Sequence, residues 1–361
     1  MGLAACAPQA SRPPASAPLP EPPRSRIALL LPLSGAQAPL GLAMQQAAEL
    51  ALFDRGNRNV EFLPLDTGGS ASGAAEAARR AVAIGARIIV GPLTAAETSA
   101  ASGPARAARI PILAFTNDAA QAGPGVWTLG VTPAQQVRRV VAAAMAEGAQ
   151  RFGLAAPEDP FGRALAAALR AEAREWGLPE PVVVLHGARA NPGAVAQDLA
   201  ARAPDGLDAV MLGSTGAMAR QIAGALAAAG LANPPPRILG HALWAQDAGL
   251  GQEPALTGAL FAAPDPESRA RFDARYERAF GERPPRLAGI AYDAAGLAAR
   301  IVLTPRGQAG PNTGEVFDGV DGPVRLQPEG VVQRGLALFA VEPMGEARIV
   351  QPAPRPGAAG S

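Results

Sequence analysis

Apolar runs of strand length alternate with helical segments along this chain, and the alternation occurs twice. The first series of runs is RIALLLPLSG, VEFLPLDTGGS, ARIIVGPLT and IPILAFTND, and the second is RFGLAAPED, PVVVLHG, DAVMLGSTG and RILGHALW. Runs that are apolar throughout are typical of parallel strands buried on both faces. Amphipathic segments between them, such as 73–84 and 95–108, have helical periodicity. The pattern predicts an α/β protein of two Rossmann-like lobes, each a doubly wound parallel sheet covered by helices.

From residue 268 onward, the sequence departs from this alternation of strands and helices. Two helices are predicted at 268–280 and 287–303, and short alternating strands joined by a Pro-Glu-Gly turn follow between 322 and 343. Residues 351–361 are rich in Pro and Gly and are predicted to be a disordered tail.

The amino terminus carries the only cysteine of the chain. Leu3-Ala4-Ala5-Cys6 fits a bacterial lipobox, in which small residues precede a cysteine that accepts a diacylglyceryl group. The charged region and apolar stretch of a signal peptide do not precede it here, so a chance cysteine in a flexible terminus is the alternative. Residues 7–26 are dense in proline and predict an extended tether. Together, residues 1–25 are interpreted as a lipobox remnant and a Pro-rich tether.

This layout is typical of a bacterial lipoprotein. Its only membrane attachment would be the lipid on Cys6, and Ala7 after the cysteine favours the outer membrane. We therefore predict a periplasm-facing location at the cell envelope.

Composition and motifs exclude several other classes of protein. The net charge of +1 gives no basic surplus for nucleic acid, and one cysteine permits neither an internal disulfide nor a cysteine-based zinc cluster. The chain has no lysine for a P-loop, and LGSTG is not a GxSxG nucleophile elbow. We expect no catalytic activity, no metal and no cofactor.

The segment RIALLLPLSGAQAPLGLAMQQAAELALFD resembles the opening of the type I periplasmic binding proteins, the branched-chain amino-acid receptor superfamily. The resemblance continues through ARIIVGPLT, EDPFGRALAAALRAEAREWG and FDARYERAFGERPPRLAGIAYDAAGLAARI. It implies two lobes that face each other across a cleft and three crossovers near Leu129–Pro133, Ala263–Glu267 and Val316–Val320. Lobe one would comprise residues 26–130 and 264–317, and lobe two residues 131–263 and 318–350.

Within the superfamily, ALLLPLSG, AMQQAAELALFD and GPLTAAET are similar to phrases of the lipoprotein activators of penicillin-binding proteins. The enterobacterial activators carry a further amino-terminal helical-repeat domain, and this chain has only the Pro-rich segment there. As polyproline, that segment would reach roughly 60 Å. Such a short arm puts in doubt whether the protein could meet an inner-membrane synthase from the outer membrane.

Polar residues at the predicted strand ends are candidates for ligand binding, because parallel sheets bind ligands beyond the carboxyl ends of their strands. The candidates are Ser34, Thr94, Ala95, Glu97, Thr116, Asn117, Asp118, Phe161, Ser214, Thr215 and His241. Many of them could equally be helix caps, and His186 is interpreted as structural.

The resemblance also indicates that the amino-acid pocket lacks several of its usual polar side chains. Amino-acid receptors of this family place Ser, Thr and an acidic residue where Ala95, Ala120 and Ala242 stand here. A buried ammonium without a carboxylate partner is costly, so a zwitterionic amino acid is disfavoured, although Asp118 or Glu97 could substitute.

Two functions remain open at this point. The first is a non-enzymatic lipoprotein that regulates peptidoglycan synthesis by contacting a penicillin-binding protein, a bifunctional synthase. The alternative is the solute-binding component of an ABC importer, which would dock on a permease and carry an amino acid, amide or peptide fragment.

Overall fold

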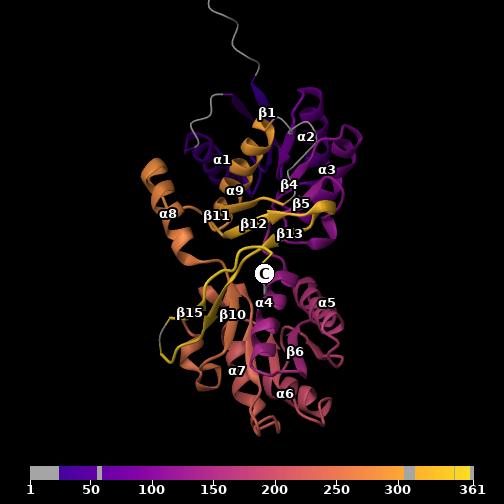
Figure 1. Ribbon diagram of the computed structural model, residues 1–361, viewed down its shortest axis with the longest axis vertical. Coiled ribbons are helices and arrows are strands. Elements are labelled where there is room, and N and C mark those ends of the chain that lie inside the picture. Colours follow the sequence, from indigo (N-terminus) through magenta and orange to yellow (C-terminus); the bar gives the residue numbers. More distant parts are fainter. Residues whose placement is uncertain (1–23, 55–58, 305–313, 345, 358–361) are drawn as a thin grey trace, which may run out of the picture.

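The first lobe is built on a parallel sheet of five strands. In the computed structural model, which describes residues 24–54, 59–304, 314–344 and 346–357, two lobes lie along the long axis of the molecule (Figure 1). The strand order of the first sheet is β2-β1-β3-β4-β5. Its strands are β1 (Ser25–Leu31), β2 (Val60–Asp66), β3 (Ile88–Val90), β4 (Ile112–Ala114) and β5 (Val126–Thr128).

Helices cover both faces of this sheet. α1 (Ala38–Asp54), α8 (Pro266–Phe280) and α9 (Ala288–Leu303) lie on one face, and α2 (Ala71–Ala83) and α3 (Ala95–Ala107) lie on the other. Strand β1 shows why its run from Ile27 to Leu31 is apolar. Ile27, Leu29 and Leu31 join the core under α1 and α9, whereas Ala28 and Leu30 join the core under α2 and α3. Successive side chains of a strand point to opposite faces, so both faces must be apolar when both are covered.

The second lobe repeats this plan. β6 (Phe152–Pro157), β7 (Val182–His186), β8 (Ala209–Leu212), β9 (Arg237–Gly240) and β10 (Leu260–Ala263) are parallel in the order β7-β6-β8-β9-β10. β14 (Ala337–Ala340) and β15 (Arg348–Gln351) extend the sheet antiparallel beside β10. The predicted fold class, two doubly wound α/β lobes, is confirmed.

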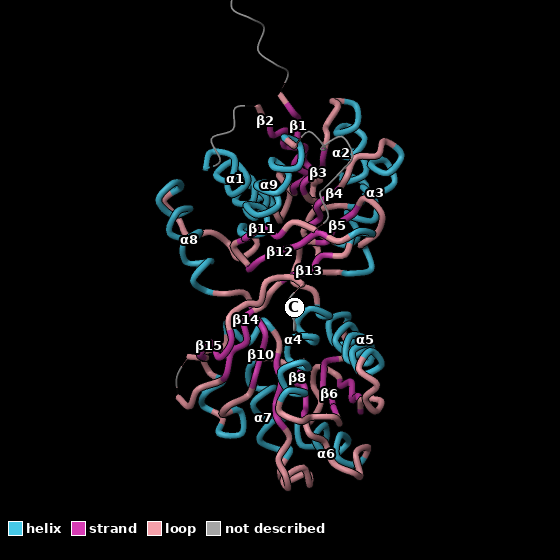
Figure 2. Tube along the Cα trace, viewed as in Figure 1, coloured by secondary structure: helices cyan, strands magenta, loops and turns pink. Residues whose placement is uncertain are grey.

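The helices of the second lobe again form two layers (Figure 2). α4 (Pro133–Ala146) and α5 (Pro160–Glu175) pack on one face of the sheet, and α6 (Pro192–Ala201) and α7 (Gly216–Leu226) pack on the other. Short 3₁₀ turns, η2 (Ala242–Gln246), η3 (Leu250–Gln252) and η4 (Pro254–Leu256), connect β9 to β10.

In each lobe, a glycine allows the helix that follows the first strand to approach the end of that strand. A Cβ atom on Gly41 in α1 would lie 2.1 Å from the carbonyl oxygen of Pro32, and one on Gly162 in α5 would lie 1.9 Å from that of Pro157. No side chain fits at such distances, so glycine is required at both positions. The same close approach recurs at equivalent places in the two lobes.

The third crossover lies later in the chain than the predicted Val316–Val320. β11 (Val316–Gly319), β12 (Gly322–Leu326) and β13 (Val332–Arg334), with the turn η5 (Pro328–Gly330), form a separate three-stranded antiparallel sheet. Val320, Val324, Leu326 and Val332 pack in the core that contains α1 and α9. The small sheet therefore belongs with lobe one, and the chain passes to lobe two between β13 and β14.

The predicted disordered tail is wrong for residues 351–357. Gln351 ends β15, and Pro356 is buried. The carbonyl oxygen of Pro352 accepts a hydrogen bond from Arg139, and Arg355 pairs with Asp318 of the small sheet. The segment after β15 thus leaves the second lobe and returns to the junction, where Arg355 meets the small sheet.

Buried polar groups join the crossovers at this junction. Arg334, which is 3 % exposed, donates to the carbonyl oxygens of Leu129 in the first crossover (2.7 Å) and Asp321 (3.0 Å). Asp293 of α9 accepts the N–H of Val320 at 2.8 Å. Burial raises the pKa of Asp293 to about 7, although the charge of Arg334 opposes that rise.

We predict that Arg334→Met lowers the free energy of unfolding by about 3 kcal/mol, because two buried carbonyl groups lose their donor. Arg355→Met is the matched control, since its ion pair with Asp318 is 70 % and 73 % exposed and such pairs contribute about 0.5 kcal/mol or less. Urea unfolding of both variants measures the contrast. Equal losses for the two arginines would show that the buried bonds do not hold the junction.

Candidate functional site

The carboxyl ends of the parallel strands in both lobes lie at the junction. The chain leaves β5 and β10 at their carboxyl ends and passes directly into the other lobe, to α4 and α8 respectively. Because the neighbouring strands are parallel, the loops after β1, β3 and β4 and those after β6, β8 and β9 also lie on the side facing the other lobe. These loops carry the residues that the sequence offered as ligand contacts.

Glu97 is fully engaged within lobe one. One carboxylate oxygen accepts the backbone N–H and the hydroxyl of Thr94 (3.0 and 2.8 Å), and the other accepts the hydroxyl of Thr67 at 2.6 Å. Glu97 in turn donates its N–H to the Thr94 oxygen, which completes a capping box at the start of α3. The side chain is 1 % exposed, and its hydrogen bonds stabilise the start of α3.

Asp118 is also used by its own loop. Its two carboxylate oxygens accept the N–H of Ala120 (3.0 Å) and the amide of Gln121 (3.1 Å). The N–H of Asp118 donates to the buried Thr116 hydroxyl, and Asn117 between them is exposed. Both acidic candidates therefore already have hydrogen-bond partners within lobe one.

Ser34 lies exposed at the end of β1, and its partner is Asp66 at the end of β2. The Asp66 carboxylate accepts the backbone N–H groups of Leu33 and Gly68, both at 2.8 Å. A hydrogen bond from the Ser34 side chain, with these backbone groups, holds the pKa of Asp66 below its ordinary value. Asp66 thus organises the loop between β1 and α1.

In lobe two, both histidines converge on Ser214. Nε2 of His186 lies 3.1 Å from the Ser214 hydroxyl, and its Nδ1 lies 3.1 Å from the carbonyl oxygen of Gly187. A carbonyl only accepts, so Nδ1 carries the proton and Nε2 accepts the serine O–H. Both ring nitrogens of His186 are therefore engaged by groups of lobe two. The Ser214 hydroxyl is engaged in the same bond.

His241 is the most deeply buried of the candidates. It is 0 % exposed, and its Nε2 lies 3.4 Å from the carbonyl oxygen of Ser214, while Nδ1 has no hydrogen-bond partner among the described residues. Phe161 packs edge-on against its ring with centroids 5.1 Å apart. Burial lowers the pKa of His241 to about 4, so the imidazole is neutral near pH 7.

Thr215 and Ala95 complete the candidate set. Thr215 is exposed at the start of α7, and its side chain makes no capping hydrogen bond. Ala95 follows the cap Thr94 and offers only a methyl group. The structure brings the candidates to the facing edges of the two lobes, and among the described residues no hydrogen bond or ring contact joins a candidate of one lobe to a candidate of the other.

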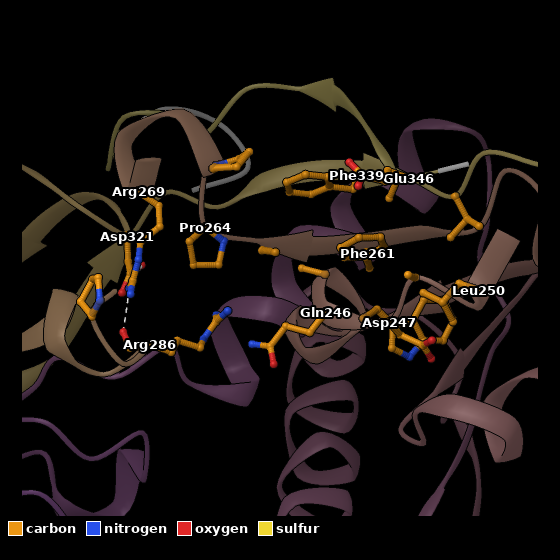
Figure 3. A pocket seen from close by; sticks show the side chains of 18 residues that line it. Gln246, Asp247, Leu250, Phe261, Pro264, Arg269, Arg286, Asp321, Phe339 and Glu346 are labelled. Atoms are coloured by element: carbon orange, nitrogen blue, oxygen red, sulfur yellow. Dashed lines mark hydrogen bonds and ion pairs between the residues drawn. The ribbon is translucent and has the colours of Figure 1, made fainter. Parts of the chain in front are cut away.

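A cavity of about 530 Å³ lies between the lobes, beside η2. Its wall includes Phe261 of β10 and Phe339 of β14, stacked with ring centroids 5.0 Å apart. Charged and polar residues at its edge come from both lobes: Gln246, Asp247, Arg269, Arg286, Asp321 and Glu346 (Figure 3).

The sequence reasoning missed every residue of this cavity. Its wall combines η2, the loop before α9 and the segment after β14, which are far apart in the sequence. No periodicity or motif relates them. The Pro284-Pro285-Arg286 turn was the one visible signal, and it indicates a fixed bend rather than a ligand.

The described residues contain no group of three or more His, Cys, Asp and Glu residues that could hold a metal ion. Within the same residues, no helix has the length and apolar character to cross a membrane. The expected lipid attachment at Cys6 lies outside the described residues.

Comparison with protein families matches residues 25–341 to a model described as periplasmic binding protein. The chain belongs to the periplasmic binding protein family. The resemblance to the type I members of this family is thereby confirmed, together with the two-lobed fold. A search of curated proteins found no match to this periplasmic binding protein.

Solved structures similar to this periplasmic binding protein fall into two groups. A putative branched-chain amino acid ABC transporter protein from Rhodospirillum rubrum is 23 % identical, with a TM-score of 0.75, and the match covers 91 % of this chain and 100 % of that one. The C-domain of LpoA from Haemophilus influenzae, titled a regulator of PBP1A, is 18 % identical with a TM-score of 0.69, covering 90 % and 100 %.

Full-length LpoA from the same organism is 17 % identical with a TM-score of 0.68, and the match covers 92 % of this chain and 59 % of that one. These identities show a common fold. They do not choose between a transport component and a regulator.

We predict that Glu97→Ala lowers the free energy of unfolding by about 2 kcal/mol, because the Thr67 hydroxyl and the first turn of α3 lose their acceptor. Asp118→Ala, which removes the cap of a 3₁₀ turn at the same sheet edge, is the control and should cost about 1 kcal/mol or less. Chemical denaturation of both variants tests this. A stable Glu97→Ala protein would mean that the carboxylate is kept for a ligand after all.

A second prediction concerns pH. The folded-state pKa of His241 is lowered to about 4 from 6.5, so its neutral ring contributes stability that is full above pH 6.5 and is lost as the pH falls toward 4. From pH 7 to pH 5.5 this loss is about 1 kcal/mol.

A His241→Gln variant cannot titrate at this position. Its difference in unfolding free energy from the wild type should therefore shrink by about 1 kcal/mol over the same pH range. Taking the difference cancels the titration of every other group, including Asp293. A difference independent of pH would contradict the neutral, buried imidazole.

Proposed function

We propose that this periplasmic binding protein is a non-enzymatic lipoprotein of the bacterial cell envelope that regulates peptidoglycan synthesis by contacting a bifunctional penicillin-binding protein. The observation that carries the proposal is that the acidic side chains of the expected amino-acid pocket are already hydrogen-bonded. Glu97 and Asp118, the acidic side chains that could replace the missing ammonium partner, both bond within lobe one. A receptor for zwitterionic amino acids needs such a group free.

The anchoring part of the proposal rests on Leu3-Ala4-Ala5-Cys6 and the proline-rich residues after it. A diacylated Cys6 would hold the lobes at a membrane surface, and Ala7 favours the outer membrane. Similarity to the LpoA C-domain, a regulator of PBP1A by its title, supports a regulatory partner. The two-lobed fold would then serve as a rigid contact surface.

The test is an assay of peptidoglycan synthesis with the purified full chain and a bifunctional synthase from the same bacterium. We expect synthesis to rise with added protein and to saturate, and we expect the two proteins to co-sediment. A branched-chain receptor of the same fold serves as the control. No stimulation together with no complex would rule the proposal out.

A specific observation favours the alternative, a solute-binding component of an ABC importer that docks on a permease. The interlobe cavity of about 530 Å³ is within the range of small-molecule sites, and the structural match to the Rhodospirillum rubrum protein covers all of that chain. Such a receptor gains stability when its solute binds, about 2.7 kcal/mol at a hundredfold excess over Kd. Thermal unfolding across a panel of amino acids, amides and peptide fragments distinguishes this role from the first.

A further inference from the structure

We propose that the distal tip of lobe one, the end farthest from lobe two, binds a phospholipid surface that carries anionic headgroups. The tip is formed by the first residues of strands β1 to β5 and by the ends of the helices that pack on them (Figure 1). This contact rests on the envelope location of the proposed function and names the surface that lobe one would meet there.

Hydrogen bonds between the elements place their ends together at the tip. The N–H of Arg87, just before β3, donates to the carbonyl oxygen of Arg26 in β1 at 2.9 Å, and the Arg26 side chain donates to that of Ile84 at the end of α2 at 2.8 Å. Arg87 also donates to the carbonyl oxygen of Val302 at the end of α9 at 3.0 Å. Arg109 lies between the end of α3 and the start of β4. The ends of α2, α3 and α9 therefore share the edge at which the strands begin.

This end of lobe one carries unpaired positive charge. Arg80 and Arg106 lie in the last turns of the neighbouring helices α2 and α3, and Arg109 follows α3. All three are exposed, and none has a hydrogen bond or ion pair with a residue that the structure describes. Arginines that stay unpaired on one end of a lobe are available to bind an anionic partner.

The carboxylates of the same elements do not neutralise these arginines, because they already have partners. The contacts are Glu61 with Arg26 at 3.5 Å, Glu76 with Arg79 at 2.8 Å, Asp54 with Arg275, and Glu49 with the amide of Gln45 at 2.8 Å. The charge of Arg80, Arg106 and Arg109 therefore remains in excess at the tip.

The corresponding end of lobe two has a different balance of charge. Arg151 before β6 pairs with Asp208 before β8 at 2.8 Å, and Arg237 at the start of β9 pairs with Glu147. The two ends are therefore not equivalent, although arginine is common throughout the chain. An anionic surface would meet the end of lobe one in preference to the end of lobe two.

An exposed aromatic ring lies near the same tip. Phe53, in the last turn of α1, is 81 % exposed. It comes a few residues before Asn59, whose carbonyl oxygen accepts the N–H of Ser25 at 2.8 Å at the start of β1. Leu303 in the last turn of α9 is 38 % exposed. Apolar side chains beside cationic groups suit a protein surface that lies on a bilayer, because the rings enter the headgroup boundary while the cations meet the phosphates.

The place where the folded chain begins favours a lipid surface over other anionic partners. Ser25 starts β1 at this tip, and Cys6 precedes it in the sequence. A lipid on Cys6 would keep the tip within roughly 60 Å of the bilayer. Confinement near a surface makes a weak attraction effective, and anionic lipids attract each arginine that comes close to them.

The test uses the full chain as a Cys6→Ser variant, so that no acyl group contributes to binding. Sedimentation with vesicles of equal parts phosphatidylglycerol and phosphatidylcholine should carry the protein into the pellet. Vesicles of phosphatidylcholine alone should leave it in solution. Binding to the mixed vesicles should weaken as salt is added, because salt screens the attraction between exposed charges.

Charge variants in the same background locate the surface. Replacing Arg80, Arg106 and Arg109 together by glutamine should weaken binding to the mixed vesicles by about tenfold or more. The matched control replaces Arg163, Arg174 and Arg189 by glutamine. These arginines of lobe two are exposed and have no partner among the described residues, so the control removes the same charge and should bind like the parent protein. Unchanged unfolding temperatures would show that both variants fold.

A dye reports which end of the molecule touches the vesicle. Cys6 is the only cysteine of the chain, so Phe53→Cys in the Cys6→Ser background provides a single thiol for a polarity-sensitive dye. Its emission should move to shorter wavelength when the mixed vesicles are added. The same dye at Trp176→Cys, a position on lobe two that is 55 % exposed, should not respond.

Several results would overturn the proposal. They are no sedimentation with the mixed vesicles at low salt, equal sedimentation with phosphatidylcholine alone, equal affinities of the two triple variants, a dye response confined to lobe two, or binding to purified peptidoglycan in place of vesicles. The synthase assay above contains no vesicles. A failure of membrane binding therefore leaves the regulatory role standing, and a failure of stimulation leaves the membrane contact standing.

Discussion

The buried guanidinium of Arg334 is the interaction on which the shape of the molecule depends. Each lobe has its own sheet and its own core, and within the described residues the chain passes between them after β5, β10 and β13, while the segment after β15 returns to the junction. Arg334 donates to Leu129 in the first crossover and to Asp321 beside the third. A buried arginine that lost these acceptors would be costly, so the two segments are held in one arrangement. Arg139, which bonds the carbonyl oxygen of Leu336, ties α4 to the start of β14 in the same way.

The polar residues at the facing edges have a related role. Glu97, Asp118, Ser214 and His186 each satisfy groups of their own lobe, and this is why strand-end position alone did not identify a binding site. A helix cap and a ligand contact demand the same residue types at the same place. What separates them is whether the side chain still has a hydrogen-bonding group without a partner among the described residues, and Thr215, which makes no capping hydrogen bond, meets this criterion.

The sequence was sufficient for the lobes, because strand residues buried on both faces must be apolar, as Ile27–Leu31 of β1 and the whole of β8 are. It was insufficient for the third crossover. β11 to β13 are short and half-exposed, so their pattern does not specify which lobe supplies the covering core. The cavity beside η2 could not be predicted either, since Gln246, Arg286 and Glu346 come together only through the packing of two lobes. The tail was misjudged because proline-rich composition does not reveal that Pro356 finds a buried place at the junction.

The direction of β1 has a consequence for how the molecule would stand at a surface. Its carboxyl end faces the junction, so its first residue, Ser25, lies at the remote tip of lobe one (Figure 1). If Cys6 carries a lipid, as proposed, the membrane attachment would therefore be on the side of that tip. Under the proposed lipid attachment, lobe one would lie nearer to the bilayer and lobe two farther from it.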